Sequence, residues 1–149
     1  MTEARIMRGG CQCGAARYAA TIRDPAGYLC HCTMCRRATG GVSIAFTNVA
    51  QADLQWESGP DWYRSSPIAE RPFCARCGTP LGFRYLDSDR IDLTIGSFDE
   101  PQFFHPTQHF AMESALHAWL DTSALPGKRS DEHQPLVDRW MNAVGKLPD

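Results

Sequence analysis

The sequence predicts a mainly β protein built from short, mostly antiparallel strands. Most segments between chain breakers are short and rich in β-branched or aromatic residues. The breakers recur at the close spacing that is typical of sheet proteins. A clear helical pattern occurs only near the end of the chain, so we expect little helix elsewhere.

Six segments are expected to form strands, and clusters of Asp, Ser, Gly and Pro separate several of them. These clusters lie at residues 24–27, 58–60 and 87–89 and predict turns. The expected strands are residues 15–22, 42–49, 54–57, 62–65, 81–85 and 91–98.

The remaining segments carry other patterns. Residues 34–39 could form a helical turn, and residues 135–144 read as a helix that starts with a proline and is followed by Gly145. The apolar residues of the second segment share one helix face: Leu136, Val137, Trp140 and Val144. We expect an exposed loop at 126–131 and poor order at 1–8.

Length and composition favour a single domain over residues 1–149. Hydrophobic residues make up 43% and charged residues 21%, as in ordinary globular proteins. No apolar run is long enough to span a bilayer, and the first residues lack the pattern of a signal peptide. We therefore expect a cytoplasmic protein without a membrane partner. The formal net charge of -2 argues against nucleic-acid binding.

Seven cysteines are many for a chain of 149 residues. Stable disulfides are rare in a reducing compartment, and an odd number cannot pair completely within one chain. Metal binding or redox chemistry is therefore the leading explanation. The cysteines form three groups, namely Cys11 with Cys13, then Cys30 with Cys32 and Cys35, and finally Cys74 with Cys77.

The first and third groups together supply four thiolates, the number that a closed zinc site requires. In an extended segment, Cys11 and Cys13 would point to the same face. The Cys-x-x-Cys-Gly pattern at 74–78 predicts a turn that brings Cys74 and Cys77 together. These four cysteines predict a structural zinc site that ties together distant parts of the chain.

The middle group, Cys30, Cys32 and Cys35, offers only three ligands. Three protein ligands leave a position for water or substrate, which is typical of a catalytic zinc site. His31 is an alternative fourth ligand, although alternation along an extended chain would point it away from Cys30 and Cys32. This group could also be vacant or merely sensitive to oxidation. Disulfides, or a thioredoxin-like redox pair at Cys74 and Cys77, are less favoured.

The cysteine-containing stretches resemble the glutathione-dependent formaldehyde-activating enzyme family, also called the centromere protein V family. The resemblance covers about residues 8–127. Its weaker matches lie in the later part of the chain, at 96–98, Pro106, His109, Ser114, Trp119, Asp121 and 125–126. The specific matches are Gly-Cys-Gln-Cys-Gly at 10–14 with Arg17-Tyr18, Cys-His-Cys-Thr-Met-Cys-Arg at 30–36, and Phe-Cys-Ala-Arg-Cys-Gly-Thr-Pro-Leu at 73–81.

This resemblance implies a Mss4-like fold of twisted antiparallel sheets around a structural zinc. It implies the same division into a four-cysteine structural site and a three-cysteine catalytic site. We expect Zn²⁺ at both sites, and full or partial occupancy of the second site stays open. The family prototype is a carbon–sulfur lyase that combines glutathione with formaldehyde to give S-hydroxymethylglutathione. Within residues 1–149, the domain core would be about 8–127, followed by the helix at about 135–144.

The leading hypothesis is thus a zinc-dependent enzyme that adds a glutathione-like thiol to formaldehyde or another small aldehyde, or catalyses the reverse. An open, thiolate-rich zinc suits a thiol better than a water nucleophile. Arg36 and Arg37 are candidates to bind an anionic thiol, and the resemblance adds His109 as a pocket residue. The alternative is a non-catalytic binding module in which only the four-cysteine site holds metal. A zinc hydrolase is a third possibility.

Overall fold

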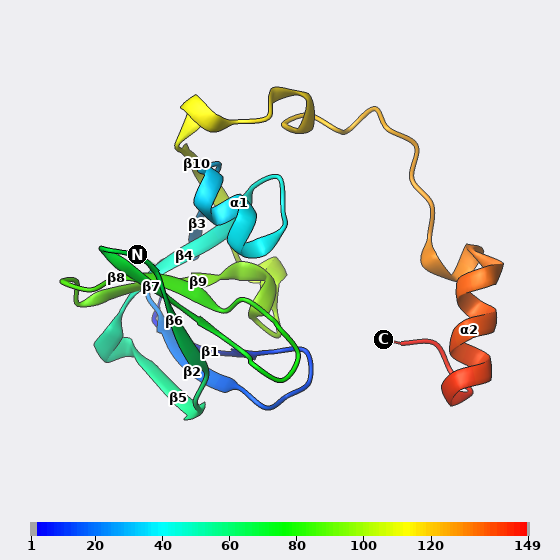
Figure 1. The fold of residues 1–149 in the computed structure, drawn as a ribbon, viewed down its shortest axis with the longest axis horizontal. Coiled ribbons are helices and arrows are strands. Elements are labelled where there is room, and N and C mark those ends of the chain that lie inside the picture. Colours follow the sequence, from blue (N-terminus) through cyan, green and yellow to red (C-terminus); the bar gives the residue numbers. More distant parts are fainter. Residues whose placement is uncertain (1–2, 149) are drawn as a thin grey trace. The chain divides into compact units, whose positions relative to one another are not determined.

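The computed structural model describes residues 3–148, and Figure 1 shows their ribbon. Two compact units divide after Leu116. The first carries all the sheets and all seven cysteines, and the second carries the C-terminal helix. The expectation that residues 1–149 form a single domain stays a prediction.

The first unit is mainly β, as the sequence predicts. Over the described residues, one sheet has three strands in the order β1-β2-β5, and the other has seven in the order β10-β3-β4-β9-β8-β7-β6. The strands are β1 (Arg5–Gly10), β2 (Arg17–Ile22), β3 (Ala26–Cys30), β4 (Ile44–Ala50), β5 (Leu54–Ser58), β6 (Asp61–Ser66), β7 (Ala69–Phe73), β8 (Gly82–Tyr85), β9 (Arg90–Thr94) and β10 (His105–Phe110).

The strand pairs are antiparallel with one exception among the described residues. Strand β10 pairs with β3 in parallel, with Phe110 opposite Cys30. The chain leaves β9 through two short 3₁₀ helices, Ile95–Ser97 and Pro101–Phe103, and returns to the end of the sheet where β3 begins. Because both strands then start from the same end, they run in the same direction, and the second sheet is mixed.

The expected strands at 15–22, 42–49, 54–57, 62–65, 81–85 and 91–98 overlap β2, β4, β5, β6, β8 and β9. Strand β3 begins inside the expected turn at 24–27, and β7 and β10 had no corresponding prediction. Each of these three strands has weak strand character, since each contains glycine, proline or several polar residues. Pairing with neighbouring strands decides their conformation.

The expectation of poor order at residues 1–8 is wrong for residues 5–8, and residues 1 and 2 lie outside the described part. Strand β1 starts at Arg5 and pairs with β2 in antiparallel register, with Met7 opposite Ala20. The Met7 side chain is buried, and Arg5 forms an ion pair with Glu100. These long-range contacts order a segment whose own sequence gives a weak signal.

The main core lies between the two sheets of the first unit. Tyr18 is completely buried, and its ring makes edge contacts with Trp56 and Phe98. Its hydroxyl lies 2.8 Å from the Ser97 hydroxyl, which satisfies a polar group that would otherwise be costly to bury. A smaller second cluster surrounds Phe46 and includes the side chains of Cys30 and Cys35.

Two α-helices are present in the described residues. Helix α1 (Thr33–Thr39) confirms the expected helical turn and follows β3 directly. Helix α2 (Gln134–Val144) confirms the expected C-terminal helix, and Gly145 ends it in a left-handed conformation. No side chain in residues 117–148 is buried, and Trp140 and Val144 are 36% and 59% exposed. Neither helix has the length and apolar character that crossing a bilayer demands.

Candidate functional site

The first candidate metal site lies between the loops that follow strands β1 and β7. The sulfur atoms of Cys11, Cys13, Cys74 and Cys77 all lie within 4.8 Å of one another. The Sγ–Sγ distance is 3.5 Å for Cys11 and Cys13, and 3.7 Å for Cys13 and Cys74. A tetrahedral zinc site with Zn–S bonds of about 2.3 Å requires sulfurs about 3.8 Å apart. The donor set therefore fits a zinc ion whose four positions are all filled by protein.

Both loops of this site are tight turns, which differs from the predicted extended arrangement at 11–13. The Gly14 amide donates to the Cys11 carbonyl at 3.2 Å, and the Gly78 amide donates to the Cys74 carbonyl at 2.7 Å. Both glycines have positive φ, 80° and 83°, which a residue with a side chain rarely adopts. The first pair of sulfurs thus converges through a turn and not through strand alternation.

The second candidate metal site is formed where strand β3 passes into helix α1. Cys30 ends the strand, Cys32 caps the helix and Cys35 lies in its first turn. The Cys32 sulfur accepts a hydrogen bond from the Cys35 backbone amide at 3.2 Å. The three sulfurs lie within 4.8 Å of one another, so the structure brings together the three predicted ligands. They supply three of the four ligands that a zinc ion takes.

His31 and His109 form a pair outside the cavity. The Nε2 atom of His31 lies 2.8 Å from Nδ1 of His109, and His31 is 1% exposed. Neither histidine lines the cavity beside the three cysteines, whereas Gln108 and Phe110 do. Alternation along β10 therefore turns His109 away from the position expected for a pocket residue.

Arg71 is a functional candidate that the sequence analysis missed. It lies on β7 and is 4% exposed, and its Nη2 atom donates to the Cys35 sulfur at 3.3 Å. Its guanidinium carbon lies 4.8 Å from the centre of the Phe83 ring, and its buried Nε has no hydrogen-bond partner. Hydrogen bonding with Cys30 and Arg71 lowers the pKa of Cys35 to about 5. The cluster thus places the Cys35 sulfur beside a fixed positive charge.

The predicted anion-binding residues Arg36 and Arg37 lie on α1 and do not line the cavity. Arg71 was missed because its strand, Ala69–Phe73, contains Glu70 and Pro72 and gives no strand pattern. The sequence offered only one hint of its role, namely that Arg71 precedes the Cys-x-x-Cys motif at Cys74 by three residues.

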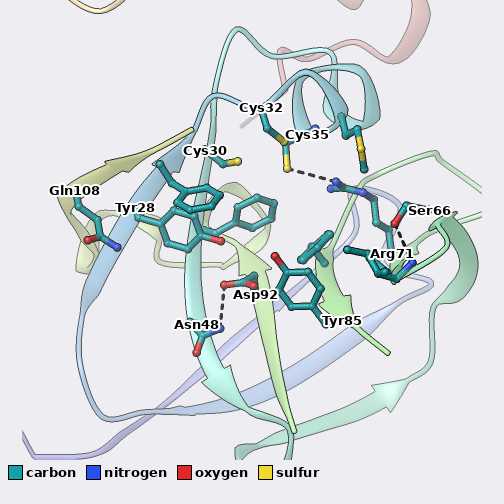
Figure 2. A pocket seen from close by; sticks show the side chains of 16 residues that line it. Tyr28, Cys30, Cys32, Cys35, Asn48, Ser66, Arg71, Tyr85, Asp92 and Gln108 are labelled. Atoms are coloured by element: carbon teal, nitrogen blue, oxygen red, sulfur yellow. Dashed lines mark hydrogen bonds between the residues drawn. The ribbon is translucent and has the colours of Figure 1, made fainter. Parts of the chain in front are cut away.

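A cavity of about 430 Å³ adjoins the three-cysteine cluster. Its walls come from strands β3, β4, β7, β8, β9 and β10, from the start of α1 and from the turn between β6 and β7. Figure 2 shows the side chains that line it, including the three cysteines and Arg71 at one end. Aromatic rings, among them Phe46 and Phe83, form much of the wall. The cavity therefore places an apolar binding space next to a cluster of thiols.

A buried carboxyl group, Asp92 on β9, lines the same cavity away from Cys32 and Cys35 (Figure 2). Its Oδ1 atom accepts a hydrogen bond from the Asn48 amide at 3.0 Å. Burial raises the pKa of Asp92, although the Asn48 amide and the Tyr28 hydroxyl oppose that effect. The sequence analysis did not single out Asp92, since an aspartate in a short strand has no distinctive pattern.

Fold and site together define a sheet protein with two cysteine clusters suited to metal and a cavity at one of them. The family profile described as glutathione-dependent formaldehyde-activating enzyme matches residues 6–114. This match covers most of the chain and includes all seven cysteines. The protein belongs to this family, as its cysteine motifs predict.

Two curated proteins are similar over about half of the chain. An uncharacterized lyase of Schizosaccharomyces pombe is 36% identical over 79 residues, which cover 53% of this chain and 58% of that protein. A Halomonas elongata protein, provisionally named a glutathione-dependent formaldehyde-activating enzyme, is 31% identical over 86 residues, covering 51% and 54%. The chain thus spans slightly more than half the length of these relatives.

A solved structure of a Rhodobacter sphaeroides protein has a similar fold. The TM-score is 0.58 at 18% sequence identity, and the alignment covers 70% of this chain and all of the other. At this identity the likeness concerns the fold alone.

Proposed function

We propose that this protein is a zinc-dependent, lyase-like enzyme that joins a glutathione-like thiol to a small aldehyde such as formaldehyde, or catalyses the reverse. In this proposal, Cys11, Cys13, Cys74 and Cys77 hold a structural zinc ion. The three-cysteine cluster holds a second zinc ion with a position left for the substrate thiol. Family membership and the names of the curated relatives support this class of reaction.

The observation that carries the proposal is the cavity at the three-cysteine cluster. A purely structural metal site has no need of a space of about 430 Å³ lined by its ligands. Cys30, Cys32 and Cys35 all line that space, so a molecule bound there lies against their sulfurs. None of the four cysteines in the other cluster lines it.

The reaction joins the thiol sulfur to the carbonyl carbon. A zinc ion bound by Cys30, Cys32 and Cys35 would lower the pKa of a coordinated thiol, so that the thiolate exists near neutral pH. As the C–S bond forms, the π electron pair of the C=O bond moves to oxygen. That oxygen then takes up a proton equivalent to the one lost by the thiol. The product is a hydroxyalkyl thioether, and no oxidant or reductant is required.

The protein contributes charge and position to this reaction. Arg71 lies 3.3 Å from the Cys35 sulfur, so its guanidinium is close to any carbonyl oxygen that becomes negative at this cluster. Its burial strengthens that interaction, because a preorganised charge acts more strongly away from water. The apolar walls hold the aldehyde, and proximity to a thiolate lowers the barrier further.

The first test measures adduct formation from glutathione and formaldehyde above the uncatalysed background. We expect a rate enhancement that depends on protein concentration and is lost in Cys32→Ser, which removes a ligand of the reactive site. Zinc content should fall from two ions per chain to one in that variant. A single zinc ion in the wild type that persists in Cys32→Ser, without rate enhancement, would indicate the non-catalytic binding module.

Cobalt substitution gives a readout that does not depend on turnover. We expect added glutathione to change the cobalt–thiolate absorption of the wild type, because a thiol enters the free position. The same addition should leave Cys32→Ser unchanged, since its remaining four-cysteine site is closed. An unchanged wild-type spectrum would contradict an open thiol-binding site, and activity without any thiol would indicate a hydrolase.

A further inference from the structure

The cavity is much larger than formaldehyde. A water molecule in the liquid occupies about 30 Å³, so the two non-hydrogen atoms of formaldehyde need on the order of 60 Å³. The cavity holds about 430 Å³, a volume within the range of sites for drug-sized ligands. Formaldehyde would leave most of this space without contacts, and small ligands gain affinity mainly from contacts.

The walls of the cavity are poorly matched to the peptide part of glutathione. Glutathione carries two carboxylates and an ammonium group, whereas Arg71 is the one cationic side chain in the lining among the described residues. Its guanidinium already contacts the Cys35 sulfur and the Phe83 ring. Burying a second carboxylate without a cationic partner would be costly. The charged ends of the thiol therefore fit the solvent outside the cavity better than its walls.

The walls are well matched to a flat, apolar molecule. Phe46 is fully buried, and its ring centre lies 5.7 Å from that of Tyr28. Phe83 lies on β8, and the Arg71 guanidinium covers one face of its ring. Ile68 and Phe110 are 63% and 56% exposed and also line the cavity. Covering these side chains with a ligand would remove apolar surface from water.

The end of the cavity away from Cys32 and Cys35 carries hydrogen-bonding groups. Asp92 and Asn48 lie there, and Figure 2 shows the Tyr85 side chain next to Asp92. The Asn48 amide donates to one carboxyl oxygen of Asp92 at 3.0 Å, and the Tyr28 hydroxyl also donates to this carboxyl group. A ligand hydroxyl can donate to an ionised carboxyl or accept from a neutral one. Either form of Asp92 therefore matches a hydroxyl substituent.

We propose that the aldehyde substrate of this protein is larger than formaldehyde and consists of an aromatic body with a hydroxyl group at the end opposite the carbonyl. The carbonyl lies at Arg71 and the three cysteines, the ring lies against Phe83, and the hydroxyl reaches Asp92. This inference rests on the proposed function for its chemistry. The nine non-hydrogen atoms of 4-hydroxybenzaldehyde need on the order of 270 Å³ at the volume of water, which the cavity can hold.

Binding is tested with an inert probe on the zinc-loaded chain of 149 residues. 4-Hydroxybenzamide has the shape of the aldehyde but does not form thiol adducts, and benzamide lacks its hydroxyl. We expect calorimetry to show about 5-fold tighter binding of 4-hydroxybenzamide, the value of one net hydrogen bond. The ratio of the two affinities should fall to about 1 in Asp92→Leu. Asn48→Ala should lower the same ratio and replaces Asp92→Leu if that variant does not fold.

Phe83→Leu should weaken both probes by about 5-fold, because it removes an aromatic contact. Asp53→Leu and Phe103→Leu are matched controls, since neither residue lines this cavity. S-methylglutathione should not compete with 4-hydroxybenzamide. Competition would assign the cavity to the peptide of the thiol and would overturn the proposal. Equal binding of both probes to the wild type would also overturn it, because the hydroxyl group would then make no favourable contact.

A rate measurement separates this proposal from the proposed function. With glutathione fixed, we expect kcat/KM for 4-hydroxybenzaldehyde to exceed that for formaldehyde by about 10-fold or more. Rate enhancement for formaldehyde alone, without probe binding, would overturn the aldehyde class and leave the proposed reaction in place. Specific probe binding without rate enhancement for either aldehyde would support the cavity assignment and overturn the reaction. Absence of both would overturn both.

Discussion

At the scale of single residues, Arg71 decides the character of the three-cysteine site. Three cysteines that bind a metal ion as thiolates would bring negative charges together, and a buried guanidinium 3.3 Å from the Cys35 sulfur lies where it offsets that charge. Phe83 stacks against the guanidinium and holds it in place. Cysteine spacing alone gives no hint of this arrangement, because the arginine comes from a different strand.

We predict that Arg71→Gln lowers kcat for adduct formation by about 100-fold while KM for the thiol changes less, because the charge acts on the developing oxyanion. Arg71→Lys should recover part of kcat. Arg84→Gln is the matched control, since Arg84 lies on the adjacent strand and pairs with Glu70. Steady-state kinetics and zinc analysis check this, and equal losses in kcat for Arg71→Gln and Arg84→Gln would refute the role.

Asp92 should make the stability of the protein depend on pH. Burial raises its pKa in the folded state, against the opposing effects of Asn48, Tyr28 and Arg90. The folded chain therefore holds this proton more tightly than the unfolded chain. The contribution of Asp92 to stability is complete below its unfolded pKa, about 3.9, and is lost as pH rises through the folded pKa.

We expect Asp92→Asn to gain stability relative to the wild type as pH rises from about 4 through the raised folded pKa of Asp92, because the amide has no proton to lose. Urea denaturation of both proteins at saturating zinc measures the difference at each pH. Proton release from the zinc-binding thiols affects both proteins equally and cancels. A difference that stays constant over this range would show that Asp92 has an ordinary pKa.

At the scale of elements, the close approach of β1 to the core depends on a glycine. A Cβ atom at Gly9 would lie 2.4 Å from the Tyr18 hydroxyl oxygen and 2.6 Å from the Ser97 carbonyl oxygen. Tyr18 is fully buried, so its ring has no free space into which to move. The glycine thus allows β1 to pack against the most buried aromatic side chain of the sheet.

We predict that Gly9→Ala lowers the free energy of unfolding by about 1–3 kcal/mol, the usual cost of overpacking a core. Gly59→Ala is the control, because a Cβ atom there would meet no atom within 4 Å. That variant should stay within about 0.5 kcal/mol of the wild type. Chemical denaturation at saturating zinc provides both values, and similar effects for the two variants would contradict a tight contact at Gly9.

At the scale of the whole molecule, the two cysteine clusters occupy different positions in the topology. The four-cysteine cluster joins the loop after β1, in the three-stranded sheet, to the loop after β7, in the seven-stranded sheet. The three-cysteine cluster lies within one continuous segment, residues 30–35. A metal ion in the first cluster would restrict the unfolded chain much more, since it closes a loop of about sixty residues.

We therefore predict that Cys11→Ser destabilises the protein far more than Cys32→Ser, although each removes one zinc ligand. Cys11→Ser should lower the melting temperature by about 10 °C or more, or prevent folding at physiological temperature. Cys32→Ser should retain the fold and one zinc ion. Calorimetry with metal analysis measures both, and equal melting temperatures would show that the four-cysteine cluster does not hold the sheets together.

The sequence by itself determined the fold class, six of the strands, both helices and the grouping of the seven cysteines. These features depend on local composition and on spacing, which short segments carry alone. The cysteine motifs also identified the family, because their spacing is unusually specific. The ligand assignment and the reaction remain proposals that start from that spacing.

The tertiary structure alone decided which residues surround the three cysteines. Arg71, Asp92 and Asn48 lie on strands separated by many residues, and the pairing of β4 with β9 and of β8 with its neighbours brings them to one cavity. Such contacts follow from strand order and register, which local patterns do not encode. For the same reason, His109 turned out to pair with His31, and the parallel strand β10 could not be foreseen.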